Sequence, residues 1–194
     1  MLEQEHEPVP TRGPRIGFPG IAGVDTDDIR ALFRRRRSSR GPFLLIGRER
    51  GLALDTPPAE QDGGSPVLWP AHAQRRQLWY FHKTSHPGEY VITSVANGLV
   101  LDAGWSSKAG RRPEMRVCTE ETHQRWRLDP VDDVAFVFES VATGRVLNVP
   151  YDASPTRPVP PILWPRHSGT SQQFLIVTPS SGLGSPRRLL RFDS

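Results

Sequence analysis

The chain has a single cysteine, Cys118, among 194 residues, so no disulfide can form within it. A lack of disulfides is typical of proteins in a reducing compartment. The first residues, 1–6, are acidic and lack the apolar core of a secretory signal. We therefore expect a cytoplasmic protein, with secretion by a non-classical route as the alternative.

Long apolar runs and catalytic motifs are also missing. No stretch approaches the roughly 18 apolar residues that a membrane-spanning helix needs, so we expect no membrane span. The six histidines show no metal-ligand spacing, and Cys118 has no CxxC partner. His72 and His167 share the pattern Trp-Pro-x-His, which symmetry and packing explain. Because the sequence also lacks G-x-S-x-G and a phosphate-binding glycine loop, we expect no metal, no cofactor and no enzymatic activity.

What the chain does contain is one segment in three copies. The glycines that open the copies are 47 and 46 residues apart, and the later glutamines are 47 and 48 apart. Two independent markers with one period indicate repeated supersecondary units that share a core. The copies are Gly51–Asp55, Gly98–Asp102 and Gly144–Asn148, followed by Gln77-Leu78-Trp79, Gln124-Arg125-Trp126 and Gln172-Gln173-Phe174.

Each copy is surrounded by short apolar runs. In the first repeat, 43–46 precedes the glycine and 67–70 lies between the two markers; the other repeats have counterparts at 90–93, 114–117, 136–139 and 162–165. Runs of this length, rich in β-branched and aromatic residues and separated by Gly, Pro, Ser and Asp, are typical of strands joined by turns. The sequence predicts four strands in each repeat, twelve in all, and almost no helix.

The repeats predict one domain over residues 42–177, divided at about 42–87, 88–133 and 134–177. This range holds 14 basic and 14 acidic residues. A folded nucleic-acid reader normally displays a basic face, so we expect no nucleic acid to bind the neutral folded domain.

The net charge of +4 therefore comes from the flanks. Residues 1–41 form a Pro- and Arg-rich tail and 178–194 a short basic tail, and we expect both to be disordered. The pattern from Asp25 to Phe33 resembles one short helix that leads into Arg34–Arg37. We favour a solvated basic linker here, with docking on an acidic partner, a membrane surface or nucleic acid as the alternative.

Three repeats of this length with Gly-x-x-Leu-Asp/Asn and a later Gln-x-Trp or Gln-x-Phe resemble the ricin-B-type β-trefoil lectins. The resemblance covers residues 42–177 and implies an all-β, pseudo-threefold β-trefoil, a six-stranded barrel closed by three hairpins. One repeat cannot bury its own apolar face, but three around an axis can pool theirs. The residues expected in this shared core are Leu54, Leu101, Leu147, Trp79, Trp126 and Phe174.

The resemblance also implies a shallow sugar pocket on each repeat. An Asp accepts hydrogen bonds from vicinal hydroxyls, an aromatic from the third strand packs on the sugar's C–H face, and an Asn before the Gln adds a polar contact. The first repeat matches best, with Asp55 and Trp69, although Arg76 replaces the Asn before Gln77. The glutamines of all three repeats are expected first of all to tie their own loops to the backbone.

The other two repeats depart further from the pattern. The second has Asp102, with His123 before Gln124 and Arg116 in place of the aromatic. The third keeps Trp164 but has Asn148 in place of Asp and Ser171 before Gln172. We expect the third pocket to be the second-best candidate and the second pocket to be degraded.

The sequence leaves two further alternatives. Trp105 and Tyr151 each lie three residues past the Asp or Asn; we expect them to fill the hairpin caps, and exposure would make them a second aromatic surface for a ligand. The leading function is a non-catalytic module that binds a glycan or glycoconjugate. The alternative is a protein-binding β-trefoil, such as a protease inhibitor or interaction domain, that uses the loops 151–161 or 59–65.

Overall fold

The computed structural model describes residues 39–57 and 62–179, and it contains twelve strands and no α-helix in that part of the chain. The strands of the first repeat are β1 (Ser39–Gly47), β2 (Leu52–Asp55), β3 (Val67–Pro70) and β4 (Trp79–Lys83). The second has β5 (Glu89–Ser94), β6 (Val100–Asp102), β7 (Glu114–Arg116) and β8 (Trp126–Pro130). The third has β9 (Ala135–Ser140), β10 (Val146–Asn148), β11 (Ile162–Trp164) and β12 (Phe174–Val177).

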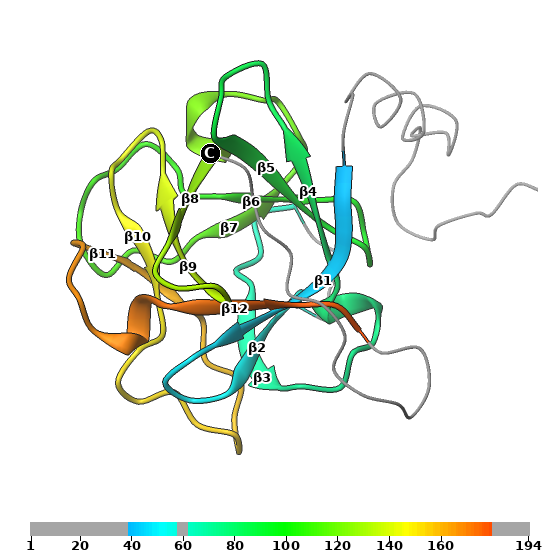
Figure 1. The fold of residues 1–194 in the computed structure, drawn as a ribbon, viewed down its shortest axis with the longest axis vertical. Helices are drawn as coiled ribbons and strands as arrows, with labels where there is room; N and C mark the ends of the chain where they lie inside the picture. The colour runs from blue at the N-terminus through cyan, green and yellow to red at the C-terminus, as the bar shows by residue number, and fades with distance from the viewer. Residues whose placement is uncertain (1–38, 58–61, 180–194) are drawn as a thin grey trace, which may run out of the picture.

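Six of these strands form a closed barrel. The antiparallel pairs β1–β4, β4–β5, β5–β8, β8–β9, β9–β12 and β12–β1 return to their starting point. Closure leaves the barrel no free edge. The remaining strands form three hairpins, β2–β3, β6–β7 and β10–β11, spread around the barrel (Figure 1). The predicted all-β trefoil of three four-stranded repeats is confirmed.

Each hairpin also bonds to a loop of another repeat through the backbone of one residue in its second strand. The loop before β3 pairs with β7, where Gly63 N donates to Met115 O at 2.7 Å. The loop before β7 pairs with β11, where Gly110 N donates to Leu163 O at 2.8 Å. Leu68 N of β3 in turn donates to Val159 O, at 2.8 Å, in the loop before β11. Each repeat therefore donates a loop to the next, and the third donates to the first.

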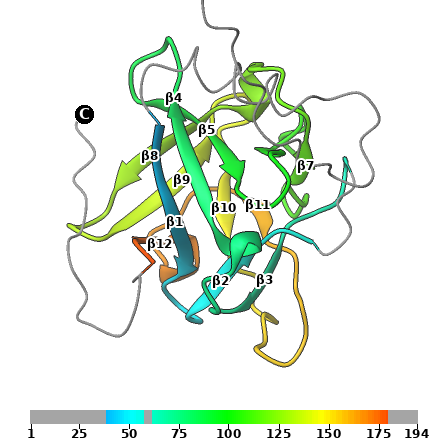
Figure 2. The ribbon, with the colours of Figure 1, turned by 90° about the vertical axis from the view of Figure 1, so that its right-hand side faces the viewer.

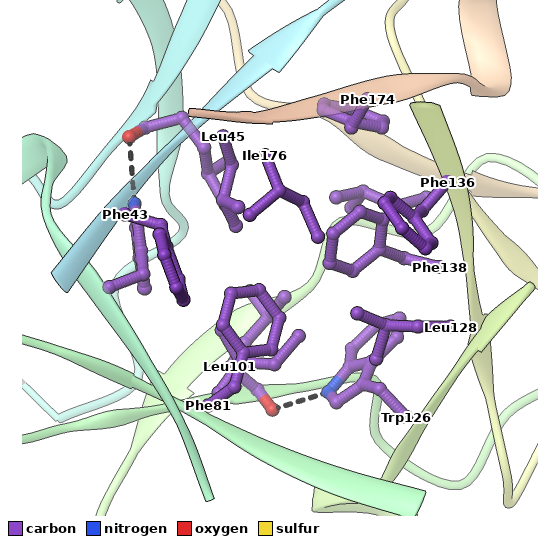
Figure 3. Close-up of a cluster of buried hydrophobic side chains, with 14 of the residues drawn as sticks. Phe43, Leu45, Phe81, Leu101, Trp126, Leu128, Phe136, Phe138, Phe174 and Ile176 are labelled. Atoms are coloured by element: carbon purple, nitrogen blue, oxygen red, sulfur yellow. Dashed lines mark hydrogen bonds between the residues drawn. The ribbon is translucent and has the colours of Figure 1, made fainter. Parts of the chain in front are cut away.

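The core lies inside the barrel, where the repeats meet. Figure 3 shows aromatic rings from different repeats pointing toward one another; Phe138 lies 6.0 Å from Phe81 and 5.7 Å from Phe174 between ring centroids. Trp126 Nε1 donates to Leu101 O at 2.9 Å, which satisfies the one polar atom of a fully buried ring. All six residues expected in the core are fully buried: Leu54, Leu101, Leu147, Trp79, Trp126 and Phe174.

Most of the predicted tails lie outside the described residues. This applies to the disorder expected for 1–41 and 178–194, to the helix before Arg34–Arg37 and to its acidic partner. β1 begins at Ser39, inside the segment assigned to the N-terminal tail. The repeat boundaries stay predictions. Across the described residues, no helix reaches the length and apolar character that a bilayer crossing requires.

Candidate functional site

The candidate pockets lie where the second strand of each repeat ends beside a short 3-10 turn. These turns are η1 (Arg75–Gln77), η2 (Thr122–Gln124) and η3 (Thr170–Gln172). Each turn follows the third strand and ends on the glutamine of Gln-x-aromatic. The second strands β2, β6 and β10 end on the polar residues Asp55, Asp102 and Asn148. The fold therefore brings the two sequence markers of each repeat together.

The glutamines hold these turns in place. Gln124 Oε1 accepts from Thr119 N at 2.7 Å and from Glu120 N at 3.2 Å, and its Nε2 donates to Val117 O at 2.9 Å. Gln77 and Gln172 make equivalent bonds to the backbone in their own repeats. All three side chains are almost completely buried. They hold the turns from below the surface. Their assignment as sugar-binding residues stays a prediction.

In the first repeat, Asp55 is buried beneath two basic side chains. Its Oδ2 lies 3.0 Å from His72 Nε2 and accepts from Gln77 Nε2 at 3.2 Å, while Arg76 Nε lies 3.4 Å from Oδ1. Within the described residues, Oδ1 accepts no hydrogen bond. Trp69, on the neighbouring strand β3, pairs with Ala53 of β2 and is half-buried.

In the second repeat, Asp102 has a full set of partners. Oδ1 accepts from Gly104 N at 2.6 Å, Oδ2 accepts from Gln124 Nε2 at 3.0 Å, and His123 Nδ1 lies 2.8 Å from both oxygens. This carboxylate therefore has little capacity left for a ligand.

Arg116 occupies the position of the third-strand aromatic in the second repeat. Its Nη2 donates to Glu114 Oε2 at 2.5 Å, and its Nη1 lies 3.7 Å from Asp62 Oδ2 of the preceding repeat's loop. The hydrogen bond to Glu114 raises the pKa of Arg116, with a smaller contribution from the negative charge of Asp62. The guanidinium is thus committed to neighbouring carboxylates.

In the third repeat, Asn148 is nearly buried and bonded within its own loop. Its Nδ2 donates to Val149 O at 2.8 Å, and its Oδ1 accepts from Ser171 Oγ at 3.2 Å. Trp164 is 40% exposed. A methyl group at Gly110 would lie 3.5 Å from the Trp164 ring, so this glycine of the second repeat lies against one side of it.

Two loop aromatics stand out on the surface. Trp105 is 65% exposed and Tyr151 is 91% exposed. The prediction that they fill hairpin caps is wrong, because both side chains face solvent, whereas Ala103 and Ala153 of the same loops are buried. Trp105 leans on His123, with 4.6 Å between ring centroids, and Arg50 lies 5.9 Å from the Tyr151 ring.

Sequence reasoning also missed the contact between His72 and Asp55, since it assigned His72 to packing alone. One ring nitrogen does make the same contact in both repeats. Nδ1 of His72 accepts from Gln74 N at 3.1 Å, and Nδ1 of His167 accepts from Gly169 N at 3.0 Å. The other nitrogen of His72 faces the carboxylate. A histidine three residues after the third-strand Trp was the available signal.

No cluster of three or more His, Cys, Asp or Glu side chains in the described part of the chain is arranged to hold a metal ion. A hollow of about 580 Å³ lies beside Gly41, Phe43 and Pro179. It borders residues that the structure does not describe, so we assign it no role. The three repeat pockets remain the candidates.

Residues 75–164 match a family model, the ricin-type beta-trefoil lectin domain-like family. The predicted resemblance is thereby confirmed. No curated protein matches the chain.

Solved structures share the fold. The designed threefold-symmetric protein ThreeFoil is 23% identical, with a TM-score of 0.66 over 72% of this chain and 100% of its own. The ricin B-like lectin of Macrolepiota procera, solved with lactose, is 22% identical, with a TM-score of 0.62 over 73% and 98%. The exo-beta-1,3-galactanase 1,3Gal43A of Clostridium thermocellum is 20% identical, with a TM-score of 0.66, over 71% of this chain but 30% of the enzyme.

Proposed function

Given a domain similar to the ricin-type β-trefoil lectins, we propose that the chain is a non-catalytic carbohydrate-binding module whose best pocket lies on the first repeat. The family match and the lectins among the structural neighbours support carbohydrate binding as the general class.

The observation that carries the proposal is the unused acceptor of Asp55. Its Oδ1 is buried and accepts no hydrogen bond from the described residues, although the Oδ2 of the same group has two partners. A buried acceptor without a donor costs about 1–3 kcal/mol, and such a group calls for an explanation. A sugar hydroxyl that donates to Oδ1 supplies the missing donor.

Arg76 controls access to this oxygen. Its guanidinium lies 3.4 Å from Oδ1, and its side chain is 39% exposed. A long, half-exposed side chain can rotate aside at small cost. Arg76 then replaces the family's Asn as a donor to a second hydroxyl, because a guanidinium carries five N–H groups.

Trp69 provides the apolar surface. It stands on β3, opposite Ala53 and two positions along the ladder from the Asp55–Val67 pair. A pyranose has one face of C–H groups and a rim of hydroxyls, so an indole beside a carboxylate suits both parts. The exposed Trp164 makes the third repeat the next candidate. Two weak pockets on one domain would raise avidity for a multivalent glycan.

The test is binding of the full-length chain to a glycan array, followed by titration calorimetry with lactose and the best array ligand. We expect Trp69→Ala and Asp55→Asn each to weaken first-repeat binding at least about tenfold. Asp133→Asn, an exposed aspartate in the β8–β9 turn, is the matched control and should bind like wild type. Equal binding by all four proteins would eliminate the first-repeat pocket, and no binding by wild type to any glycan would eliminate the function.

A second candidate function is protein binding through the loop 151–161, which projects from the domain between β10 and β11 (Figure 2). The loop is firmly held. Ala153 and Val159 are buried, Arg157 Nη2 donates to Asp152 Oδ2 at 2.6 Å, and Arg50 Nη2 donates to Tyr151 O at 2.9 Å. A rigid exposed loop is what an inhibitor or interaction domain presents to its partner.

This alternative predicts a protein ligand whose binding fails when the loop is changed and persists when the sugar pocket is changed. Pull-down with the wild-type chain, then with Arg157→Ala and with Trp69→Ala, separates the two functions. A partner that is lost with Arg157→Ala and kept with Trp69→Ala supports protein binding. A partner that is released by free lactose supports the lectin function.

A further inference from the structure

The second repeat lacks the features that make the first a candidate sugar pocket, yet its Trp105 is 65% exposed. Asp102 accepts from Gly104, His123 and Gln124, so both of its oxygens are occupied. Arg116 replaces the third-strand aromatic and is tied to Glu114 and Asp62. If this repeat binds a ligand, other groups must do so.

The backbone of the loop 102–105 places Trp105 at the surface. Gly104 has φ +64°, in the left-handed region where side chains are disfavoured, and its N–H donates to Asp102 Oδ1 at 2.6 Å. This turn brings Trp105 back over the 3-10 turn η2. The indole stays 65% exposed while its ring lies 4.6 Å from that of His123 at an interplanar angle of 58°.

The polar groups beside this ring are His123 and Glu121. Nδ1 of His123 donates to the Asp102 carboxylate, with 2.8 Å between the two atoms. Nε2 lies 3.3 Å from Glu121 Oε2, so the ring is held between two carboxylates. The Glu121 side chain is 56% exposed. The exposed carboxylate of Glu121 suits a ligand that donates, such as a pair of sugar hydroxyls.

We propose that the second repeat carries a sugar subsite of a different build, in which Trp105 supplies the stacking face and the Glu121 carboxylate, which contacts His123, accepts from hydroxyls. This proposal rests on the proposed carbohydrate-binding function and assigns it residues outside the family's pattern. Because the exposed carboxylate of Glu121 lies close to the stacked ring, the subsite favours a neutral glycoside over one that carries a carboxylate there.

The experiment uses the full-length chain with Asp55→Asn, Trp69→Ala and Trp164→Ala, which removes the first-repeat pocket and the third-repeat candidate. Lactose is titrated while the indole N–H resonances are followed by NMR, and 3′-sialyllactose serves as the anionic counterpart. We expect the Trp105 resonance to move with lactose, and the added change Trp105→Ala to weaken the remaining binding at least about tenfold. Sialyllactose should bind at least about fivefold more weakly than lactose.

Tyr151→Ala in the same background is the matched control, since Tyr151 is the other exposed loop aromatic; it should leave lactose binding unchanged. Glu121→Gln should relax the discrimination against sialyllactose, and unchanged melting temperatures keep these results separate from misfolding. Unchanged lactose binding after Trp105→Ala overturns the subsite, as does equal or tighter binding of sialyllactose. If wild type binds a sugar but the background variant with all three changes binds none, this inference fails while the proposed function stands. If wild type binds no sugar at all, both fail.

Discussion

Replacing the glutamine of Gln-x-aromatic by alanine should destabilise the domain unequally. The loss should be largest for Gln124, smaller for Gln77 and smallest for Gln172. The amide of Gln124 bonds to Thr119 N, Glu120 N, Val117 O and Asp102 Oδ2. That of Gln172 bonds to His167 N and Pro165 O. The same substitution to alanine therefore leaves more buried polar groups without a hydrogen-bond partner in the second repeat than in the third.

The magnitude follows from the groups left behind. A buried polar atom that loses its partner costs about 1–3 kcal/mol, and water that enters the vacated space recovers part of this. We expect Gln124→Ala to lose about 3 kcal/mol and Gln172→Ala about 1–2 kcal/mol. One further contribution belongs to the first two repeats: Ala73 and Glu120 have φ of 56° and 63°, and their N–H groups donate to Gln77 and Gln124. Each glutamine thus stabilises an unfavourable backbone conformation.

The assay is equilibrium unfolding in urea, followed by tryptophan fluorescence, with the midpoint and the slope fitted for each variant. Gln74→Ala is the control, because Gln74 is exposed and lies just before η1; its midpoint should match wild type within about 0.5 kcal/mol. Equal losses in all three repeats, or a loss below about 0.5 kcal/mol for Gln124→Ala, would refute the reasoning that the amide bonds hold the turns.

Three more outcomes are expected. Trp126→Phe should cost about 1–3 kcal/mol in urea unfolding, because it leaves the buried Leu101 carbonyl, now 2.9 Å from Nε1, without a donor. Gly104→Ala should lower the melting temperature, because an alanine at φ +64° is strained by about 1 kcal/mol, and it should shift the Trp105 indole resonance. The pKa of Asp132 is lowered, first by the hydrogen bond from Val134 N and then by Arg48. Its contribution is therefore complete above the ordinary aspartate value of about 4 and is lost as pH falls through the depressed folded value. The stability difference between wild type and Asp132→Ala should accordingly be present at about pH 6 and vanish at about pH 2; a difference that grows toward low pH would contradict this sign.

The strands and the core could be predicted because they depend on patterns that recur. Leu54, Leu101 and Leu147 occupy the same position in each copy, and all are fully buried. Threefold repetition turns a weak local signal into a strong one, since an apolar residue that serves only one site has no reason to recur at a fixed spacing. The same reasoning covered the glutamine ties, which are the same in kind in every repeat.

The site was less predictable because it depends on what differs between repeats. Asp55 and Asp102 look equivalent in the sequence, yet Asp102 is saturated by Gly104 and His123 while Asp55 keeps an unused oxygen. Which case applies depends on a backbone turn and on side-chain reach. The position of Trp105 was unpredictable for the same reason: its ring lies exposed against His123 after Gly104, whose left-handed backbone angle the sequence does not give.

Each repeat contributes one loop to the next, and this arrangement bears on how such a domain can arise. Met115 and Leu163 receive the loops of the preceding lobes through pairs of backbone bonds, and Leu68 receives that of the last one. A head-to-tail contact that returns to its start after three steps has the geometry of a cyclic trimer. Three separate copies of one repeat would therefore be able to make every one of these contacts with one another. Gene triplication then needs only to join ends that already meet, as β1 and β12 do here through Leu44 and Val177.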